Sequence, residues 1–200
     1  MARRNPQPRD TQNRLKNAAA EVFTTRGYSL SGVDHIVEQA GTTRGAFYYY
    51  FASKADVARD IQEELWTAAG SRAAEVVEAE ADFLTKARRG LEVYLAALKD
   101  LGPERAFLQQ SFAEPSLVMF DGEGKKWGRH FVRDLLIEAM DNGEIPRQDP
   151  ERPTSLLVEA LQALTRTALD NDDVTDALRV IEELNEALVA GEFAEVGRPS

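Results

Sequence analysis

The side chains best suited to chemistry lie between residues 43 and 54, and they are aromatic and basic rather than nucleophilic. Arg44 carries a guanidinium whose paired N–H groups match the O6 and N7 atoms of guanine in the DNA major groove. Tyr48 and Tyr50 carry phenolic hydroxyls that donate hydrogen bonds to phosphate oxygens, which fixes the register of a protein on DNA. These residue types in one short segment indicate a surface that contacts nucleic acid.

Three consecutive tyrosines, Tyr48–Tyr50, form the centre of this segment. A packed aromatic cluster is the alternative interpretation, but helix neighbours point about 100° apart, so a small domain cannot bury all three. We expect Tyr49, together with Arg44, to face the base edges of DNA. Thr43 or Ala46 is expected to contact the methyl group of thymine.

Two further polar residues stand where helices are predicted to begin. Lys54 opens a long helix, so its charge and the N-terminus of that helix both favour a phosphate. Ser31 can bind a phosphate in the same way at the start of a shorter helix. The predicted DNA-contacting residues are therefore Ser31, Thr43, Arg44, Gly45, Ala46, Tyr48, Tyr49, Tyr50 and Lys54.

The elements that position these residues can be predicted from apolar spacing and capping residues. Apolar residues at steps of three and four predict a helix over residues 10–26. A second, short helix follows, with Ser31 as its N-cap and Gly41 as its end. Thr43 caps a third helix of about two turns, and residues 53–56 have the form of a capping box that opens a long fourth helix. Two short helices joined by a tight glycine turn, after a longer helix, describe a three-helix DNA-binding unit.

The rest of the chain is also predicted to be helical. The further helices are expected at about residues 54–80, 82–101, 103–112, 125–142, 153–170 and 173–190. No segment of useful length alternates apolar and polar residues, and no apolar run reaches 18 residues, so we expect neither strands nor a transmembrane helix. The expected fold class is all-α.

Charge is distributed unevenly along the chain. The net charge is −10, which taken alone argues against a nucleic-acid partner. Residues 1–59, however, contain nine basic and five acidic residues, whereas residues 60–200 contain 15 basic and 29 acidic residues. A basic head on an acidic body favours DNA binding by the head, although chance clustering on a solvated surface gives the same pattern. Arg3, Arg4 and Arg9 either reach the minor groove or belong to a disordered tail.

Several classes of site are excluded or disfavoured. The chain has no cysteine, which excludes disulfides, thiolate zinc sites and cysteine nucleophiles. Glycine-containing motifs that bind nucleotides or present a nucleophilic serine are missing. Residues 170–173 are rich in aspartate, but the residues that follow do not fit a calcium loop, and helix capping by Asp173 is the better interpretation. We expect no enzyme activity, no catalytic or metal-binding residue and no cofactor. The basic N-terminus lacks a following apolar segment, so we expect a cytoplasmic protein rather than a secreted one.

Several of these residues occur together at fixed spacing. The pattern A-G-x-x-x-G-x-x-Y-x-[HY]-F-x-x-K is matched by Ala40-Gly41, Gly45, Tyr48, Tyr50-Phe51 and Lys54, and Phe23, Gly27 and Ile36 upstream fit as well. This segment resembles the helix-turn-helix of the tetracycline-repressor (TetR) family of bacterial regulators. The resemblance implies about nine helices. Those in residues 1–53 would form an N-terminal DNA-binding domain, and those in residues 54–200 a C-terminal domain for ligand binding and dimerisation.

The resemblance also implies a ligand pocket between helices of residues 54–200. Aromatic residues are frequent there, and an apolar cavity with a few polar anchors is what a small-molecule site needs. Ordinary core packing is the alternative for each aromatic residue taken singly. The predicted ligand-binding residues are Trp66, Tyr94, Phe107, Phe112, Phe120, Trp127, Phe131, Gln162 and Arg166.

The last two predicted helices carry broad apolar stripes. In the TetR family the corresponding helices pair with their symmetry mates as a four-helix bundle, which implies a homodimer; a core within one chain is the alternative. The predicted dimerisation residues are Leu157, Leu161, Leu164, Leu178, Ile181, Leu184 and Leu188. A two-fold dimer predicts a pseudo-palindromic operator.

Taken together, these expectations describe a DNA-binding transcriptional regulator. The leading interpretation is a homodimeric repressor that binds double-stranded operator DNA and is released by a small apolar or amphipathic effector. One alternative is a helical protein that binds a small molecule or a partner and for which DNA binding is minor. The other is an activator or a corepressor-dependent regulator, because the sign of regulation depends on which state the ligand prefers.

Overall fold

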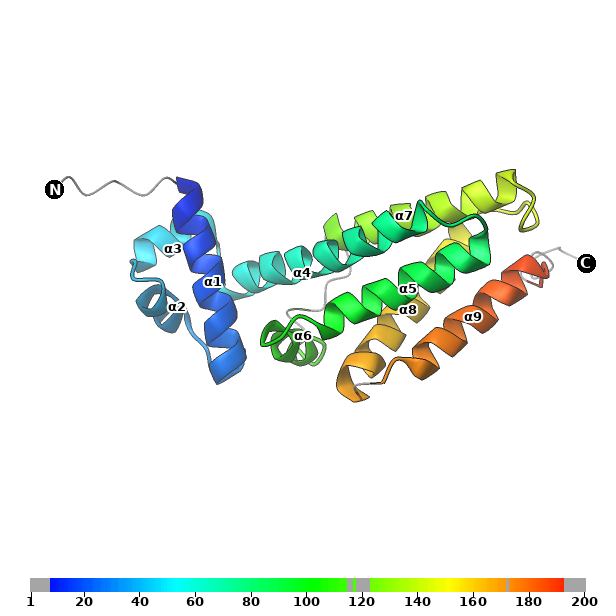
Figure 1. The fold of residues 1–200 in the computed structure, drawn as a ribbon. Coiled ribbons are helices and arrows are strands. Elements are labelled where there is room, and N and C mark those ends of the chain that lie inside the picture. The colour runs from blue at the N-terminus through cyan, green and yellow to red at the C-terminus, as the bar shows by residue number, and fades with distance from the viewer. Residues whose placement is uncertain (1–7, 115–116, 118–122, 172, 193–200) are drawn as a thin grey trace, which may run out of the picture. The chain divides into compact units, whose positions relative to one another are not determined.

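The computed structural model describes residues 8–114, 117, 123–171 and 173–192, and within those ranges every regular element is an α-helix (Figure 1). The helices are α1 (Pro8–Arg26), α2 (Val33–Gln39), α3 (Arg44–Tyr50), α4 (Lys54–Val77), α5 (Phe83–Lys99), α6 (Glu104–Ser111), α7 (Glu123–Asp141), α8 (Glu151–Asn171) and α9 (Thr175–Val189). The predicted all-α fold class is confirmed.

Short polar side chains start several of these helices, as the sequence predicts. Thr43 Oγ1 accepts a hydrogen bond from the Ala46 amide at 3.2 Å, which caps α3. Ser53 Oγ accepts from the Asp56 amide at 3.1 Å, so the predicted cap of α4 is confirmed. Asp82 caps α5 by accepting from the Thr85 amide at 2.9 Å. These caps satisfy backbone amides that have no partner within the first helical turn.

The predicted N-cap of α2 is wrong by one residue. Gly32, not Ser31, occupies that position with an extended backbone, and its amide donates to His35 Nδ1 at 3.1 Å. The Ser31 hydroxyl instead donates to the Gly27 carbonyl oxygen at 2.6 Å, at the end of α1. A serine followed by glycine has the composition of a cap, and only the path of the chain shows which residue takes that role.

The chain divides into two compact units. The first unit comprises residues 1–64 and 101–119, and the second comprises residues 65–100 and 120–200. Helix α6 therefore groups with the N-terminal helices, although residues 51–103 separate it in sequence from the end of α3. The boundary predicted between residues 53 and 54 concerns function and stays a prediction.

The first unit is built on a core of aromatic and aliphatic residues from α1, α2, α3 and α6. Phe23, Ile36 and Phe47 are fully buried, and Phe51 is nearly so. Phe107 of α6 stacks on Phe23 with ring centroids 5.3 Å apart. The short helices α2 and α3 are thus held by tertiary packing, which helices of seven residues require.

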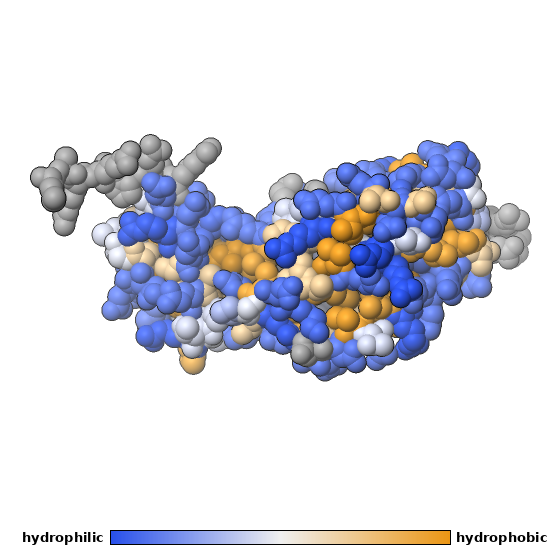
Figure 2. All heavy atoms as spheres, viewed as in Figure 1, coloured by the Kyte–Doolittle hydropathy of each residue, from blue (hydrophilic) through white to orange (hydrophobic). Residues whose placement is uncertain are grey.

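The second unit packs α5, α7, α8 and α9 around two apolar clusters. One cluster contains Phe83, Leu136, Ala139, Met140, Ile145, Leu157 and Leu188. The other contains Leu91, Leu95, Ala168, Ala177 and Ile181, with Tyr94 and several leucines packed against it. Figure 2 shows hydrophilic residues over most of the visible face, with apolar residues between them.

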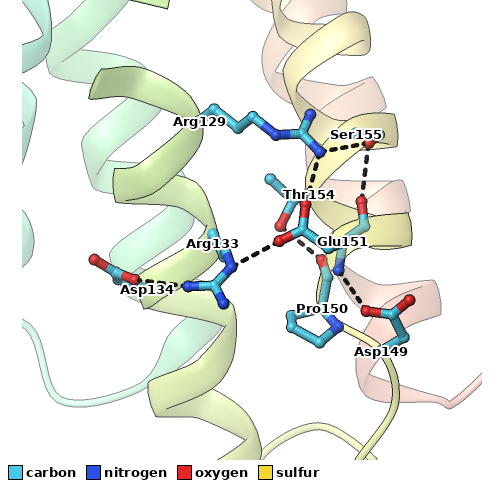
Figure 3. A network of polar contacts seen from close by, with 8 residues as sticks. All are labelled: Arg129, Arg133, Asp134, Asp149, Pro150, Glu151, Thr154 and Ser155. Carbon is cyan, nitrogen blue, oxygen red and sulfur yellow. Dashed lines mark hydrogen bonds and ion pairs between the residues drawn. The ribbon is translucent and has the colours of Figure 1, made fainter. Parts of the chain in front are cut away.

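Polar contacts also join α7 to the start of α8 (Figure 3). Arg129 Nη2 donates to Glu151 Oε2 at 2.8 Å and to Ser155 Oγ at 3.0 Å, while Arg133 Nε donates to Glu151 Oε1 at 2.7 Å. Hydrogen bonds from Arg129 and Arg133 lower the pKa of the Glu151 carboxyl. Glu151 is exposed, so this network orients two helices more than it stabilises the fold.

Candidate nucleic-acid interface

Helix α3 has one buried face and one exposed face. Phe47 is buried in the core, and Phe51 directly after the helix is buried as well, so these two side chains anchor the helix. Tyr48 and Tyr49 are 55% and 79% exposed, which is unusual for large aromatic residues that have no role on a surface. Tyr50 is half-buried, and its ring lies edge-on to Tyr49 with centroids 4.8 Å apart.

The residues at the start of α3 are exposed on the same element. Thr43, Arg44 and Gly45 are exposed, and Ala46 is half-buried. The structure therefore brings together six predicted DNA-contacting residues with polar or small accessible groups, Thr43, Arg44, Gly45, Ala46, Tyr48 and Tyr49. Phenolic hydroxyls and a guanidinium on an exposed helix can bind phosphates and base edges but hold no group that activates a nucleophile.

The turn between α2 and α3 is held from α1. Arg14 donates hydrogen bonds from Nη2 to the carbonyl oxygens of Ala40 and Gly41. Gly41 has a φ of 59°, a left-handed conformation that favours glycine, and its amide donates to the Glu38 carbonyl at 3.1 Å. These contacts fix the angle at which α3 leaves α2, and the sequence pattern contains the glycine but not its arginine partner.

Lys54 points toward the turn between α1 and α2. Its ammonium donates to the carbonyl oxygens of Tyr28 at 2.7 Å and Ser31 at 2.9 Å, and it lies 3.9 Å from the centroid of the Tyr28 ring. Desolvation by burial lowers the pKa of Lys54. Ser31 is buried and its hydroxyl is engaged by the Gly27 carbonyl. Lys54 and Ser31 thus have partners inside the protein, and their predicted phosphate contacts stay predictions.

Helix α6 also contributes to the same turn, which the sequence did not indicate. Gln110 Oε1 accepts from the Tyr28 amide at 3.1 Å, and Ser29 Oγ donates to Glu114 Oε1 at 2.5 Å. These partners are 82 and 85 residues apart in sequence, so no local pattern could have indicated them. The turn before α2 is therefore held by Lys54 from α4 and by α6 together.

Arg44 has a partner on α2. Its guanidinium makes a two-point ion pair with the carboxylate of Asp34, although both side chains are more than 60% exposed. The hydrogen bonds from Arg44 lower the pKa of Asp34. The residue with the best chemistry for reading a base is thus oriented on the surface before any DNA is bound.

Known proteins match both the sequence of this unit and the fold of the chain. A family model described as bacterial regulatory proteins of the tetR family matches residues 15–61. The HTH-type transcriptional regulator SrpR of Pseudomonas putida is 44% identical over 48 residues, which are 24% of this chain and 22% of SrpR. The uncharacterized HTH-type transcriptional regulator YxaF of Bacillus subtilis strain 168 is 23% identical over 192 residues, which are 88% of this chain and 93% of YxaF. The crystal structure of the transcriptional regulator FadR from Bacillus subtilis in complex with stearoyl-CoA has the same fold. It aligns with a TM-score of 0.66 and 22% identity over 90% of this chain and 98% of FadR.

Residues 15–61 thus carry the DNA-binding domain of the TetR family. The match to SrpR spans about a fifth of that relative, because the sequence similarity is concentrated in the DNA-binding segment. The likeness to YxaF and FadR extends along nearly the whole chain. TetR-family proteins are DNA-binding transcriptional regulators rather than enzymes, and the prediction that the chain is not an enzyme is confirmed on this basis.

The predicted ligand-binding residues of this TetR-family chain are dispersed. Phe107 and Phe112 lie in the first unit, where Phe107 is buried against Phe23, and we leave both out of the proposed ligand site. Phe120 and the side chain of Trp127 lie outside the described residues. In the second unit, Trp66, Tyr94, Phe131 and Gln162 are half-buried, and Arg166 is exposed.

Tyr94 lies among buried residues of the second unit. It packs against the apolar cluster formed by α5, α8 and α9, and desolvation by burial raises the pKa of its hydroxyl. Thr165 of α8 lies beside it and is 1% exposed. The Thr165 hydroxyl makes no hydrogen bond of ordinary geometry among the described residues, which is uncommon for a buried polar atom, but it lies close enough to the Tyr94 hydroxyl to oppose the rise in that group's pKa. Thr165 could not be predicted from sequence, because a threonine in a helix gives no signal of how its hydroxyl is bonded.

The predicted dimerisation residues pack largely within the chain. Leu157, Ile181 and Leu188 are buried in the two clusters of the second unit, and Leu161, Leu164, Leu178 and Leu184 pack against those clusters while keeping part of their surface. The exposed side of α8 instead carries Leu156, Ala163 and Thr167, with half-buried Ala160 between them. A role of the predicted leucines in dimerisation stays a prediction.

No helix in the described ranges is both long and apolar enough to cross a membrane. Among the same residues, no three histidine or acidic side chains are grouped in a way that could hold a metal ion.

Proposed function

We propose that this TetR-family regulator binds a specific operator by placing α3 in the DNA major groove. The observation that carries the proposal is the division of α3 into a buried face, with Phe47, and an exposed face, with Tyr48 and Tyr49. Burying Phe47 fixes the helix, while two tyrosines left in solvent have accessible hydroxyls for phosphates or bases. Arg44 at the first position of α3 adds a guanidinium on the same helix.

Binding of labelled duplexes from the DNA flanking the gene tests this proposal by fluorescence anisotropy. Tyr48→Phe removes only the hydroxyl and should weaken binding by about 1 kcal/mol, whereas Tyr48→Ala also removes the ring and should weaken it further. Leu84→Ala, which shortens an exposed apolar side chain in α5, is the matched control and should bind like the wild type. Equal affinity of all four proteins would contradict the proposed role of α3.

We further propose that the regulator is a homodimer that recognises a pseudo-palindrome. The support is the exposed side of α8, where Leu156, Ala160, Ala163 and Thr167 recur at steps of four, three and four residues. Small residues at such steps allow two helices to approach closely, and two copies of α3 could then occupy major grooves one turn apart, about 34–36 Å. Sedimentation velocity tests this proposal. Ala163→Arg should shift the protein toward monomer, and Ser71→Arg on the exposed side of α4 should not.

The finer proposal is a repressor released by a small apolar or amphipathic effector. FadR of Bacillus subtilis binds stearoyl-CoA with a similar fold, and the second unit of this chain contains a buried Thr165 hydroxyl beside Tyr94 that makes no hydrogen bond of ordinary geometry. Such a hydroxyl in an apolar core is the kind of polar anchor that a ligand uses for orientation. Its cost to stability would be compensated when the ligand supplies the missing hydrogen bond.

Three probes separate effector classes: decanol, decanoate and stearoyl-CoA. If the effector is neutral, decanol should raise the unfolding temperature of the protein and release it from DNA. Thr165→Val should reduce both responses. Release by none of these molecules would contradict this effector class, and tighter DNA binding with ligand would indicate a corepressor-dependent regulator instead.

A further inference from the structure

Arg44 and Asp34 form an ion pair across the two helices of the proposed DNA-binding motif. Asp34 lies in the first turn of α2, and Arg44 is the first residue of α3. Nε of Arg44 donates to Oδ1 of Asp34, and Nη2 donates to Oδ2, so the carboxylate occupies the side edge of the guanidinium. The two side chains are 64% and 63% exposed. Nothing in the apolar core requires this pair.

The remaining donors of Arg44 have a defined arrangement. A guanidinium has five N–H groups in one plane, and the ion pair uses two of them. Of the three others, one on Nη1 and one on Nη2 are parallel and form the end edge of the same plane. Two parallel N–H groups are what O6 and N7 of guanine accept in the major groove. The carboxylate thus holds one edge of Arg44 and leaves available the edge that suits guanine.

We infer that Asp34 is a specificity-determining residue, which holds Arg44 in the orientation that reads one guanine in each operator half-site. The inference rests on the proposed binding of DNA by α3. Asp34 itself needs no contact with the base, because it acts by limiting the orientations of a long and otherwise free side chain. When a side chain with many rotamers is already held in its binding orientation, less conformational entropy is lost on binding, which raises affinity for the matching base by about 2- to 13-fold.

The charge of Asp34 has a second consequence. A carboxylate near the DNA backbone is repelled by phosphates, so it weakens binding to every sequence. If its only effect were electrostatic, removing it would strengthen binding to all DNA without changing base preference. Loss of orientation at Arg44 instead reduces the preference for guanine while general affinity rises. The electrostatic effect changes only the affinity for all DNA, whereas the loss of orientation also changes the preference for guanine. Substituting another acidic residue of α2, which does not contact Arg44, shows the electrostatic effect alone.

The experiment is selection of duplexes from a random library, followed by sequencing, with full-length variants. Asp34→Ala removes the carboxylate that holds Arg44. Arg44→Lys keeps the positive charge but removes the paired N–H groups. Glu38→Ala is the matched control, because Glu38 is an exposed acid of the same helix with no part in the ion pair. Both members of the pair are exposed, so the variants should fold, and thermal unfolding of each checks this.

The wild type should enrich one guanine per half-site, and Arg44→Lys should lose that preference. Asp34→Ala should reduce the preference for that guanine by about 2- to 13-fold while raising affinity for unselected DNA. Glu38→Ala should raise affinity for unselected DNA to a similar degree and should keep the wild-type preference for guanine.

The inference would be overturned if Asp34→Ala enriched guanine as strongly as the wild type does, or if Arg44→Lys kept every guanine preference of the wild type. Either result would leave DNA binding by α3 intact. If the wild type enriches no sequence at all, the proposed function itself is contradicted, and the inference falls with it.

Discussion

The two compact units differ in where their polar groups find partners. In the first unit, Arg14, Lys54 and Gln110 all bind backbone atoms of the turns before α2 and α3, and these contacts leave Tyr48 and Tyr49 of α3 in solvent. In the second unit the apolar stripes of α8 and α9 are used in the chain's own core, and the buried Thr165 hydroxyl makes no hydrogen bond of ordinary geometry. The first arrangement holds the turns on either side of α2 and leaves the outer face of α3 accessible, whereas the second uses its apolar stripes within the chain.

The largest expected effect separates the two faces of α3. Phe47→Ala should destabilise the protein by about 3–5 kcal/mol, because it leaves a cavity in the core of the first unit. Tyr49→Ala should change stability by less than about 0.5 kcal/mol, because its side chain is exposed. Urea unfolding followed by circular dichroism measures both. Similar losses for the two variants would show that Tyr49 is part of the fold rather than of a binding surface.

The next effect concerns the turn before α2. Lys54→Ala should cost about 1–3 kcal/mol of unfolding free energy, because the carbonyl oxygens of Tyr28 and Ser31 lose their charged donor. Arg59→Ala removes an exposed cation from the same helix and is the control, with an expected change below about 0.5 kcal/mol. If Lys54→Ala keeps full stability and loses only DNA binding, Lys54 contacts phosphate as the sequence suggested.

A smaller effect of opposite sign is expected in the second unit. Thr165→Val should stabilise the protein by up to about 1 kcal/mol, because it removes a buried hydroxyl that makes no hydrogen bond of ordinary geometry. Thr154→Val is the matched control: the Thr154 hydroxyl is buried too but donates to the Pro150 carbonyl at 2.7 Å, so its loss should destabilise by about 1 kcal/mol. Differential scanning calorimetry distinguishes the two. Destabilisation by both substitutions would mean that Thr165 already has a partner.

The smallest effect depends on pH. Hydrogen bonds from Arg129 and Arg133 lower the pKa of Glu151 in the folded protein, so its contribution to stability is present above the unfolded-state pKa. That contribution is lost as pH falls through the lowered folded-state pKa. Urea unfolding at pH 7 and pH 3 should therefore show a weaker acid dependence for Glu151→Gln than for the wild type. Glu186→Gln, an exposed acid of α9, is the control. Identical pH dependence of Glu151→Gln and wild type would mean that the network of Figure 3 adds nothing to stability.

Much of the fold could be predicted from sequence because its signals are local. Thr43 and Ser53 stand three residues before the amides that they cap, and the apolar residues of each helix recur at steps of three and four. The outward face of α3 followed from the same logic, since three adjacent tyrosines cannot all point inward. Local chemistry thus predicted both the helices and the exposed part of the candidate site.

The rest depends on partners distant in sequence. The pattern identified Lys54 as a cation at a helix start, but only the fold shows that it faces the carbonyl oxygens of Tyr28 and Ser31. The leucines of α8 and α9 were predicted to be buried, and periodicity says nothing about whether the covering surface belongs to the same chain. Gln110 shows the same limit, because its partner Tyr28 is 82 residues away.

The salt dependence of operator binding tests the central claim most directly. If α3 and its flanking basic residues bind the phosphates of DNA, the logarithm of the association constant falls linearly with the logarithm of salt concentration, with a slope of about −0.9 for each phosphate contact. We predict a steep negative slope for the wild type and a weaker affinity for Tyr48→Ala at every salt concentration. A flat slope, or binding indifferent to Tyr48, would contradict the assignment of α3 as the DNA-contacting helix.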